Sequence, residues 1–332
     1  MSAESTPTVL QTDRAWPDDS IERQVIEAAG LALVSGPPHA SPTETVERMV
    51  AERQPAAIMT CWAPVSAAAI AASPALRLVA RMGVGLDNIA VDAATERGVL
   101  VTNVPDYCVE EVSDHAVGLV LAWTRGLVRT DREVRAGRWD PGAARLRRLA
   151  TLTCGVIGYG RIGRVSARKL ADLGARVIAS DPFAPADTRG VPVVPLDELL
   201  RSSDAVIVHA PLTPATRHLI GSRELSLMPA EALLVNVSRG ALVDTAALIE
   251  ALRDGRLGGA GLDVLESEPA VPRELLEHPG VVITPHIGFS SDVAVEQLRR
   301  STAEEVVRVL SGQPPLHLCN QPAATAAKGA RP

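Results

Sequence analysis

The stretch GVIGYGRIG, residues 155–163, places Gly158, Gly160 and Gly163 in the spacing G-x-G-x-x-G. The apolar run that leads into it is typical of a β-strand, and the segment after it, Arg161–Leu173, has helical periodicity. Glycine at these positions permits a tight turn and close packing of the helix against the strand. The stretch therefore predicts a strand–turn–helix unit, the repeating unit of a parallel α/β sheet.

A glycine loop in this context is the fingerprint of a dinucleotide-binding site, because a pyrophosphate can rest against the N–H groups at the start of the helix. Asp181 ends the next apolar run, eighteen residues after Gly163. A carboxylate there would accept hydrogen bonds from ribose hydroxyls and repel a 2′-phosphate. The sequence thus predicts NAD(H) as the cofactor. The alternative interpretation is a structural glycine turn beside a surface aspartate.

Strand and helix signals alternate along most of the chain, whose 332 residues suggest two domains. The first series of expected strands is PTVLQT, LALVSG, AAIMTC, LRLVARMG and GVLVTNVP, and the second is LTCGVIG, ARVIASD, DAVIVHA, ALLVNVS, GAGLDV and VVITP. We expect the intervening helices to open on Asp, Ser or Thr caps, as in DDSIERQVIEAAG and SPTETVERMVAER. Alternation of this kind predicts parallel sheets with helices on both faces.

Two further segments are predicted to be helical. Residues 109–139 have apolar residues at 3–4 spacing and predict one long helix for packing between domains or subunits, and residues 292–312 predict a second helix. The tail, residues 321–332, has no apolar periodicity and is expected to be disordered.

Composition excludes several classes of function. The net charge of −6 and the absence of a basic block argue against a nucleic-acid partner. No apolar run approaches about 18 residues, and the N-terminus has no signal-peptide pattern, so neither a membrane span nor export is expected. The cysteines are far apart and form no CxxC, which predicts reduced, mostly buried thiols of a cytoplasmic protein and no metal site: Cys61, Cys108, Cys154 and Cys319.

Three late strands of the second series are each followed by a residue suited to catalysis. Arg239 follows ALLVNVS, Glu266 and Glu268 follow GAGLDV, and His286 follows VVITP, which we expect to be a buried strand. Ligands bind beyond the carboxyl ends of parallel strands, so we expect these side chains at the edge where the glycine loop holds a nicotinamide.

The chemistry of the three side chains fits hydride transfer to or from an alcohol carbon. A histidine at His286 can take or give the hydroxyl proton. A carboxylate at Glu268 can orient the imidazole and stabilise its protonated form. The guanidinium of Arg239 suits bidentate binding of a substrate carboxylate. The alternatives are an ordinary core or surface histidine and a solvated loop arginine.

On these residues, the sequence resembles the D-isomer-specific 2-hydroxyacid dehydrogenase family from about Leu76 to Asn320. The matching pieces are GVIGYGRIG, HAPLTPATRHLI, LLVNVSRGALVDTAAL, GAGLDVLESEP and ITPHIG. The resemblance implies that the catalytic set is Arg239, Glu268 and His286. It assigns cofactor contacts to Gly158, Tyr159, Gly160, Arg161, Ile162, Gly163, Asp181, Ala210, Val237, Ser238 and Asp263, and the substrate pocket to Arg81, Val84, Gly85 and Phe289.

The resemblance also implies an architecture of two Rossmann-like or flavodoxin-like α/β domains with parallel, doubly wound sheets and an active-site cleft between them. The substrate-binding domain would comprise residues 1–102 plus 290–320, and the NAD-binding domain residues 103–289. The cleft would close on hinges near Asn103 and Phe289. The helix that starts near Glu110 would form the arm of a homodimer.

Within the family, RMGVGLDNIAV, NVPDYCVEEVSDHAVGL and ESEP are most similar to the branch that includes the C-terminal binding proteins. Phe289 stands where that branch has tryptophan and where phosphoglycerate-oxidising members of the family commonly have a small residue. An aromatic wall at this position favours apolar or aromatic substrates. The implied activity is NAD-dependent oxidation of a D-2-hydroxy acid or, in the reverse direction, reduction of a 2-oxo acid. The alternative is an NAD(H)-sensing, corepressor-like interaction protein.

Overall fold

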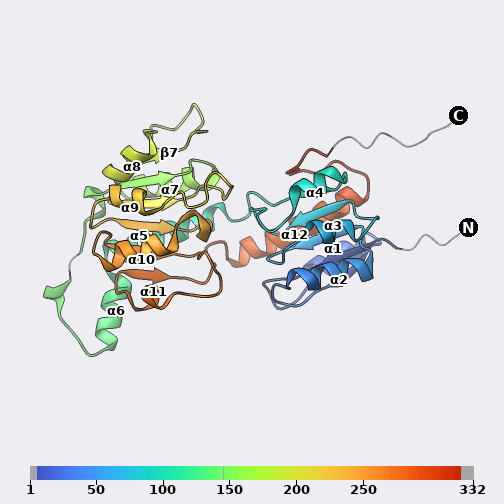
Figure 1. Cartoon of the computed structure of the whole chain (residues 1–332), viewed down its shortest axis with the longest axis horizontal. Coiled ribbons are helices and arrows are strands. Elements are labelled where there is room, and N and C mark those ends of the chain that lie inside the picture. Colours follow the sequence, from blue (N-terminus) through green and yellow to red (C-terminus); the bar gives the residue numbers. More distant parts are fainter. Residues whose placement is uncertain (1–5, 145, 323–332) are drawn as a thin grey trace, which may run out of the picture. The chain divides into compact units, whose positions relative to one another are not determined.

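The computed structural model describes residues 6–144 and 146–322, and the chain divides into two compact units. Unit 1 comes from the ranges 1–107 and 291–332, and unit 2 is residues 108–290. The divisions lie close to the boundaries expected near residues 102 and 290. Each unit is a parallel sheet flanked by helices (Figure 1). The expected tail lies outside the described residues from position 323 onward.

Unit 1 contains a five-stranded parallel sheet in the order β2-β1-β3-β4-β5, the flavodoxin-like doubly wound order. All five strands of the first predicted series are present: β1 Thr8–Gln11, β2 Ala32–Ser35, β3 Ala57–Thr60, β4 Leu78–Arg81 and β5 Leu100–Thr102. The helices are α1 Ser20–Ala28, α2 Thr43–Arg53, α3 Ala67–Ala71, α4 Val91–Glu96 and the returning α12 Asp292–Leu310.

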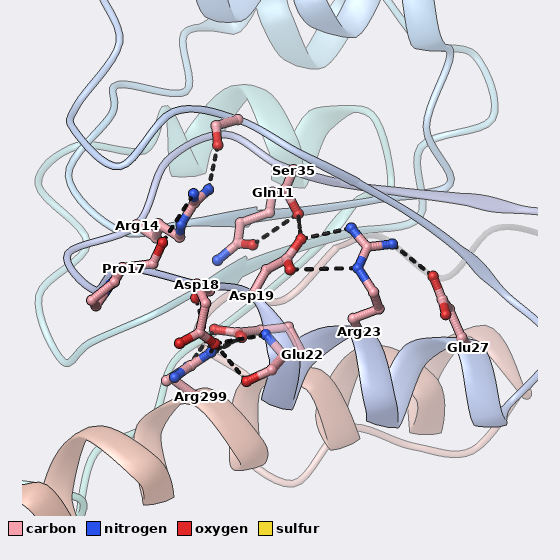
Figure 2. A network of polar contacts seen from close by, with 12 residues as sticks. Gln11, Arg14, Pro17, Asp18, Asp19, Glu22, Arg23, Glu27, Ser35 and Arg299 are labelled. Carbon is pink, nitrogen blue, oxygen red and sulfur yellow. Dashed lines mark hydrogen bonds and ion pairs between the residues drawn. The ribbon is translucent and has the colours of Figure 1, made fainter.

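The predicted side-chain cap of α2 is wrong, because its N-cap residue is Pro42. At α1 the N-cap residue Asp19 makes no capping hydrogen bond, and Asp18 Oδ1 accepts from Ser20 N, the first N–H of the helix, at 2.9 Å. The carboxylate of Asp19 instead binds Arg23 and Ser35 (Figure 2). A carboxylate that is already paired with a guanidinium and a hydroxyl gains little by turning toward the helix N–H groups.

A buried ion pair joins α12 to the start of the chain (Figure 2). The guanidinium of Arg299 donates to Glu22 on α1 at 2.7 Å, and the Glu22 side chain is fully buried. Arg299 also bonds Asp18 at 3.1 Å and lies over the ring of Trp16, 5.3 Å from its centroid. The two distant parts of the chain that form unit 1 are therefore held together by charge as well as by apolar packing.

Unit 2 contains a six-stranded parallel sheet in the order β11-β10-β9-β8-β6-β7. All six predicted strands are present: β6 Thr153–Ile157, β7 Arg176–Ser180, β8 Ala205–Val208, β9 Leu233–Asn236, β10 Gly259–Leu262 and β11 Val281–Ile283. The prediction that β11 is buried is wrong in part. Only Val281 is buried, because β11 is the outermost strand on its side of the sheet.

The helices of unit 2 are α5 Val109–Thr124, α6 Leu127–Arg135, α7 Arg161–Asp172, α8 Leu196–Ser202, α9 Ser222–Leu227, α10 Thr245–Arg253 and α11 Arg273–Glu277. Helix α5 packs beside α7, while α9 contacts both α8 and α10 (Figure 1). The two groups of helices correspond to the two covered faces that alternating βαβ units predict.

A short parallel bridge completes the strand order of unit 2. Ala179 in β7 pairs with Val193, through hydrogen bonds from Ala179 N to Pro192 O and from Val194 N to Ala179 O. With this bridge counted as a third strand beside β7, the first six strands have the order 3-2-1-4-5-6 of a Rossmann fold.

The single long helix predicted for residues 109–139 is two helices. Helix α5 ends at Thr124, and α6 starts at Leu127, with Gly126 between them at φ +61°. Gly126 adopts the left-handed conformation at little cost because it has no Cβ atom. This residue turns the chain where the apolar periodicity alone predicts continuity.

The cysteines are free, and three of them, Cys61, Cys108 and Cys154, are buried as predicted. Cys319 is partly exposed. Among the residues that the structure describes, no three His, Cys, Asp or Glu side chains are arranged as metal ligands. Over the same residues, no helix has both the length and the apolar composition needed to cross a bilayer.

Candidate active site

The glycine loop joins β6 to α7, and two of its glycines have no room for a side chain. Gly158 has φ +88°, and a Cβ atom there would lie 2.7 Å from Ala210 N. A Cβ atom at Gly163 would lie 2.0 Å from the carbonyl oxygen of Gly158. Gly160 differs, because nothing lies within 4 Å of the place its Cβ would occupy. The loop is therefore packed on one side and open at Gly160.

The polar groups around the loop are suited to bind the pyrophosphate and the ribose of a dinucleotide. Arg161 and Ile162 begin α7, and no side chain caps this helix, so its N-terminus can receive a phosphate. Asp181 follows β7, and its carboxylate accepts a hydrogen bond from Tyr159 N at 2.7 Å and one from Phe183 N at 2.8 Å. An aspartate fixed to the loop at the end of β7 fits the ribose-binding position expected from the sequence.

Tyr159 contributes its backbone rather than its side chain to the open surface of the loop. The ring is buried, and the hydroxyl donates to Thr188 O at 2.9 Å. Burial raises the pKa of the Tyr159 hydroxyl. The side chain thus ties the glycine loop to the segment after β7, and any cofactor contact of Tyr159 would come from its peptide group.

The remaining cofactor candidates of this edge follow β8 and β9. Ala210 is buried against Gly158, and Val237 is buried after β9. The hydroxyl of Ser238 donates to Val208 O at 2.8 Å, which links the ends of the two strands. All three lie at the carboxyl edge of the sheet, as expected.

His209 is a polar residue of this edge that the sequence pattern did not single out. It is partly buried and pairs with Ser166 on α7 through Nε2 at 2.8 Å. Burial lowers the pKa of His209 to about 4, so the imidazole is neutral near pH 7. The motif HAPLT contains this histidine, but nothing in its spacing indicates a partner on the helix that follows the glycine loop.

Glu268 and His286 form a hydrogen-bonded pair. Glu268 Oε2 lies 2.8 Å from His286 Nδ1, and Glu268 Oε1 accepts from Leu265 N at 2.9 Å. Burial is the largest single influence and alone would raise the pKa of the Glu268 carboxyl, but the hydrogen bond to His286 and the charge of that ring oppose it. The Leu265 N–H and the charge of Arg239 act in the same direction, so the pKa of Glu268 lies below its usual value. The carboxylate is therefore ionised where enzymes normally work.

His286 is held in an uncommon backbone conformation, with φ +54°. Its N–H donates to Asp263 O at 2.8 Å. The carboxylate of Asp263 accepts from Thr284 Oγ1 at 2.6 Å, from Ile287 N at 2.9 Å and from Gly288 N at 2.8 Å. Residues on both sides of His286 are thus fastened to one buried aspartate, which supplies the constraint that a left-handed histidine needs.

Asp263 has a structural role, in addition to the cofactor contact expected from the sequence. A carboxylate accepts about four hydrogen bonds, and three are made within unit 2. His115 on α5 bonds Thr284 Oγ1 at 2.9 Å and lies 3.4 Å from Asp263 Oδ1. Sequence reasoning missed both Thr284 and His115, because their roles depend on contacts between segments far apart in the sequence.

Arg239 lies after β9, in a segment with little freedom. Asn236 Nδ2 donates to Arg239 O at 2.9 Å, and the Arg239 guanidinium donates to Ser238 O at 2.9 Å. At the next residue, a Cβ atom on Gly240 would lie 1.9 Å from the carbonyl carbon of Leu265. The segment that carries Arg239 is therefore pressed against the segment that carries Glu268.

Phe289 stands beside the catalytic candidates. Its ring is 6.4 Å from the His286 ring, centroid to centroid, with the planes at 76°. Unit 2 thus brings Arg239, Glu268, His286 and Phe289 to the same sheet edge as the glycine loop.

The other substrate candidates belong to unit 1. Arg81 ends β4, is buried, donates to Met82 O and lies 5.8 Å over the ring of Trp62. Val84 and Gly85 follow in the next loop, where Val84 is 37% exposed and its carbonyl accepts from Asn103 Nδ2 at 2.7 Å. These contacts fix the loop after β4 within its own unit.

The fold and this edge of the sheet define an α/β protein with a Rossmann unit and a carboxylate–histidine pair. Residues 117–288 match the NAD binding domain of the D-isomer specific 2-hydroxyacid dehydrogenase family. The chain belongs to that family, and its unit 2 is a nicotinamide-cofactor domain.

Individual relatives support the same assignment. The chain is 40% identical over 266 residues to a glyoxylate reductase from Korarchaeum cryptofilum. The aligned region covers 78% of this chain and 80% of the relative. It is 42% identical over 252 residues to a D-3-phosphoglycerate dehydrogenase from Mycobacterium leprae, over 75% of this chain. The chain spans about half of that curated relative's length, 48%. A solved glyoxylate reductase from Paecilomyes thermophila superposes with a TM-score of 0.86 at 28% identity, covering 96% of this chain and 99% of the other.

Proposed function

We propose that the protein is an NAD-dependent D-2-hydroxyacid dehydrogenase that works as a 2-oxo acid reductase in the cytoplasm. The observation that carries the proposal is the Glu268–His286 pair, 2.8 Å apart at the sheet edge that also holds the glycine loop and Arg239. A histidine held by a carboxylate is well suited to give a proton to a carbonyl oxygen. Membership of the family supports the same reaction class.

Each catalytic side chain has a distinct part in reduction. The bound nicotinamide would supply hydride to the C2 carbon of the 2-oxo acid. His286 gives a proton from Nε2 to the C2 oxygen, since Nδ1 is bound to Glu268. Glu268 orients the ring and stabilises its protonated form. Arg239 binds the substrate carboxylate and polarises the neighbouring carbonyl.

The cofactor would be NAD(H) rather than NADP(H). Its pyrophosphate would rest on the open face at Gly160 and on the uncapped start of α7. Asp181 would bind the ribose hydroxyls and repel a 2′-phosphate. The further contacts proposed from the sequence are Gly158, Tyr159, Arg161, Ile162, Gly163, Ala210, Val237, Ser238 and Asp263. For Asp263 this would use its fourth acceptor position.

The substrate contacts proposed from the sequence are Arg81, Val84, Gly85 and Phe289. The ring of Phe289 would favour an apolar or aromatic substrate side chain. The exposed apolar residues of the α6 region, which include Leu127 and Trp139, fit the expected homodimer arm.

The test compares His286→Ala with His278→Ala under NADH and a panel of 2-oxo acids. The first variant should lose roughly 10²–10⁴-fold in kcat, the usual contribution of a positioned proton-transfer group, with little change in NADH affinity. His278 lies in the turn before β11, where its Nδ1 accepts from Gly280 N, and its loss should leave kcat close to wild type. A wild-type protein that binds NADH but reduces no 2-oxo acid would instead favour the NAD(H)-sensing interaction protein.

A further inference from the structure

A second carboxylate, two residues before Glu268, links its own loop to two other segments of unit 2. The Glu266 side chain is 22% exposed, and its Oε1 atom lies 2.7 Å from His218 Nε2 and 2.9 Å from Arg217 Nη2. Its Oε2 atom accepts from Thr245 Oγ1 at 3.1 Å. Thr245 is the first residue of α10, so Glu266 connects the loop after β10, the segment before α9 and the start of α10.

These partners stabilise the ionised form of the Glu266 carboxyl. Burial alone would raise the pKa of the carboxyl, but hydrogen bonds from His218 and Thr245 outweigh it, and the pKa is lowered. An ionised carboxylate only accepts hydrogen bonds, so the proton of the His218–Glu266 contact is on His218 Nε2. Asp244 is the other acidic group facing this ring, 3.9 Å from His218 Nδ1.

The backbone at His218 reaches the segment that carries Arg239. His218 N donates to Ala241 O at 2.8 Å, and Ile220 forms a parallel bridge with Val243. His218 has φ +53°, a left-handed conformation that few residues with a side chain adopt. The residues directly after Arg239 are therefore bonded along one side to the His218 segment.

The other side of the same segment touches the loop of Glu268. Gly240 has no space for a Cβ atom, which would lie 2.3 Å from Glu266 N. Leu265, next to Glu266, donates its N–H to Glu268 Oε1 at 2.9 Å. A continuous series of contacts thus runs from His218 through Glu266 and Leu265 to Glu268 and, through Glu268 Oε2, to His286.

We infer that Glu266 and His218 form a positioning pair, which holds the Arg239 and Glu268 segments at a fixed separation without touching the substrate. The inference rests on the proposed function, in which Arg239 and Glu268 must act on one bound 2-oxo acid. The pair would raise kcat by holding the catalytic groups in place, because displacement of a catalytic group by about 1 Å can lower the rate about 10²-fold. Cofactor binding depends on the glycine loop and Asp181, which the pair does not contact.

The test measures kcat, KM for the 2-oxo acid and the dissociation constant of NADH for Glu266→Ala, Glu266→Gln and His218→Asn. Glu266→Ala should lower kcat by roughly 10- to 100-fold while NADH affinity is retained. Glu266→Gln keeps an acceptor for His218 and should recover part of the loss. Asparagine tolerates the left-handed backbone at position 218 but cannot reach Glu266, so His218→Asn should behave like Glu266→Ala. Combined with Glu266→Ala, it should add little.

Asp204→Ala is the matched control. Asp204 is also a partly buried carboxylate that joins segments, through Thr153 N at 2.9 Å and Arg147 at 3.6 Å, but it lies at the opposite edge of the sheet, before β8. Its loss should lower the melting temperature without lowering kcat. Wild-type kcat in folded Glu266→Ala, or an equal loss of kcat in Asp204→Ala, would overturn the inference. If Glu266→Ala does not fold, wild-type kcat in His218→Asn has the same meaning.

A readout without turnover separates this inference from the proposed function. In protein labelled with ¹⁵N-histidine, the His286 ring signals, assigned with His286→Ala, should shift in Glu266→Ala and stay in place in Asp204→Ala. A wild type without activity whose His286 signals respond in this way would contradict the proposed reaction and leave the positioning pair standing. Unshifted signals together with unchanged kcat would contradict the pair and leave the reaction standing.

Discussion

At the scale of single residues, Glu268 uses both oxygens before any substrate arrives, one on His286 and one on the Leu265 backbone. Its pKa is lowered, so the carboxylate keeps its negative charge beside the ring at every pH at which histidine titrates. That charge favours the protonated imidazole, which is the form that gives a proton during reduction.

Replacing Glu268 by Gln should therefore move the pH profile of reduction. The amide keeps a hydrogen-bonding group but no charge, so the protonated ring is less favoured and kcat should fall at a lower pH than in wild type. The difference in kcat should be small at acid pH and should grow as the pH rises. Measuring kcat against pH with saturating NADH checks this, and superimposable profiles would contradict it.

His209 predicts how stability responds to acid. The unfolded chain takes up a proton at this residue near pH 6.5, but the folded protein does so only near pH 4. Because the unfolded state binds more protons between these values, stability falls as the pH is lowered through them. Between pH 7 and pH 5 the contribution is about 2 kcal/mol, from 1.36 kcal/mol per pKa unit.

His209→Gln should remove that part of the acid sensitivity, since glutamine can still reach Ser166 but does not titrate. Urea unfolding of both proteins at pH 7 and pH 5 measures the difference. The free energy of unfolding should drop less for the variant than for the wild type over this interval. An equal drop in the two proteins would assign the acid sensitivity to other groups.

Sequence could predict which residues stand at strand ends but not what holds them there. Arg239, Glu268 and His286 each come within a few residues of the end of an apolar run, and a parallel sheet gathers such positions at one edge. The anchoring of His286 by Asp263 depends on the angle at which one loop leaves β10 and another leaves β11. Neither apolar periodicity nor residue type encodes that angle.

At the scale of elements, the strands were easier to predict than the ends of the helices. Strands buried on both faces read as short apolar runs between turn residues, as in β8 and β9. Helix ends depend on competition between partners: Asp244 caps α10 by accepting from Ala247 N, whereas Asp19, at the N-cap position of α1, binds Arg23 instead. The same residue type predicts a cap in both places.

The break between α5 and α6 gives a prediction for Gly126. Alanine there must adopt φ +61°, and its Cβ atom would lie 3.0 Å from Leu146 Cδ2. Gly126→Ala should cost roughly 1–2 kcal/mol, the penalty of the left-handed conformation for a residue with a side chain. Thermal and urea unfolding provide the measurement.

Gly118 is the control for this substitution. It lies inside α5, is exposed, and has nothing within 4 Å of the place that a Cβ atom would occupy. Gly118→Ala should stabilise the protein by roughly 0.5–1 kcal/mol, because alanine favours a helix interior. If both substitutions stabilise the protein, residues 109–135 can form the continuous helix that the sequence pattern predicts.

At the scale of the whole molecule, the chain leaves unit 1 after residue 107 and returns to it at residue 291. Helix α12 is consequently the last large piece of unit 1 to be made, although it packs against α1, one of the first. The pairing of Arg299 with Glu22, 277 positions away in sequence, fixes the register of the two helices (Figure 2).

The sequence predicts the return of the chain, since residues 292–312 have a helical pattern after the last strand of the second series. It does not predict the ion pair. Glu22 and Arg299 are charged residues of kinds that are abundant in this chain, and only the packing of α12 on α1 removes both from water.

Breaking this pair should destabilise unit 1 selectively. Arg299→Met leaves the fully buried Glu22 without its main counter-charge and should cost about 3–5 kcal/mol. Glu22→Leu should cost less, because Arg299 keeps Asp18 as a counter-charge at 3.1 Å. The double variant replaces both charges by apolar groups. It should be less destabilised than the sum of the two single variants, because the attraction within a buried ion pair only slightly exceeds the cost of removing both charges from water.

Hydrogen exchange, resolved by peptide, measures which part of the molecule loses stability. Exchange should quicken in α1, α12 and β1–β5 of each single variant and stay near wild type in β6–β11, since the pair lies wholly within unit 1. Equal quickening across both sheets would mean that the two units unfold together, in which case the division of the chain at residues 107 and 291 would not mark a boundary of cooperative folding.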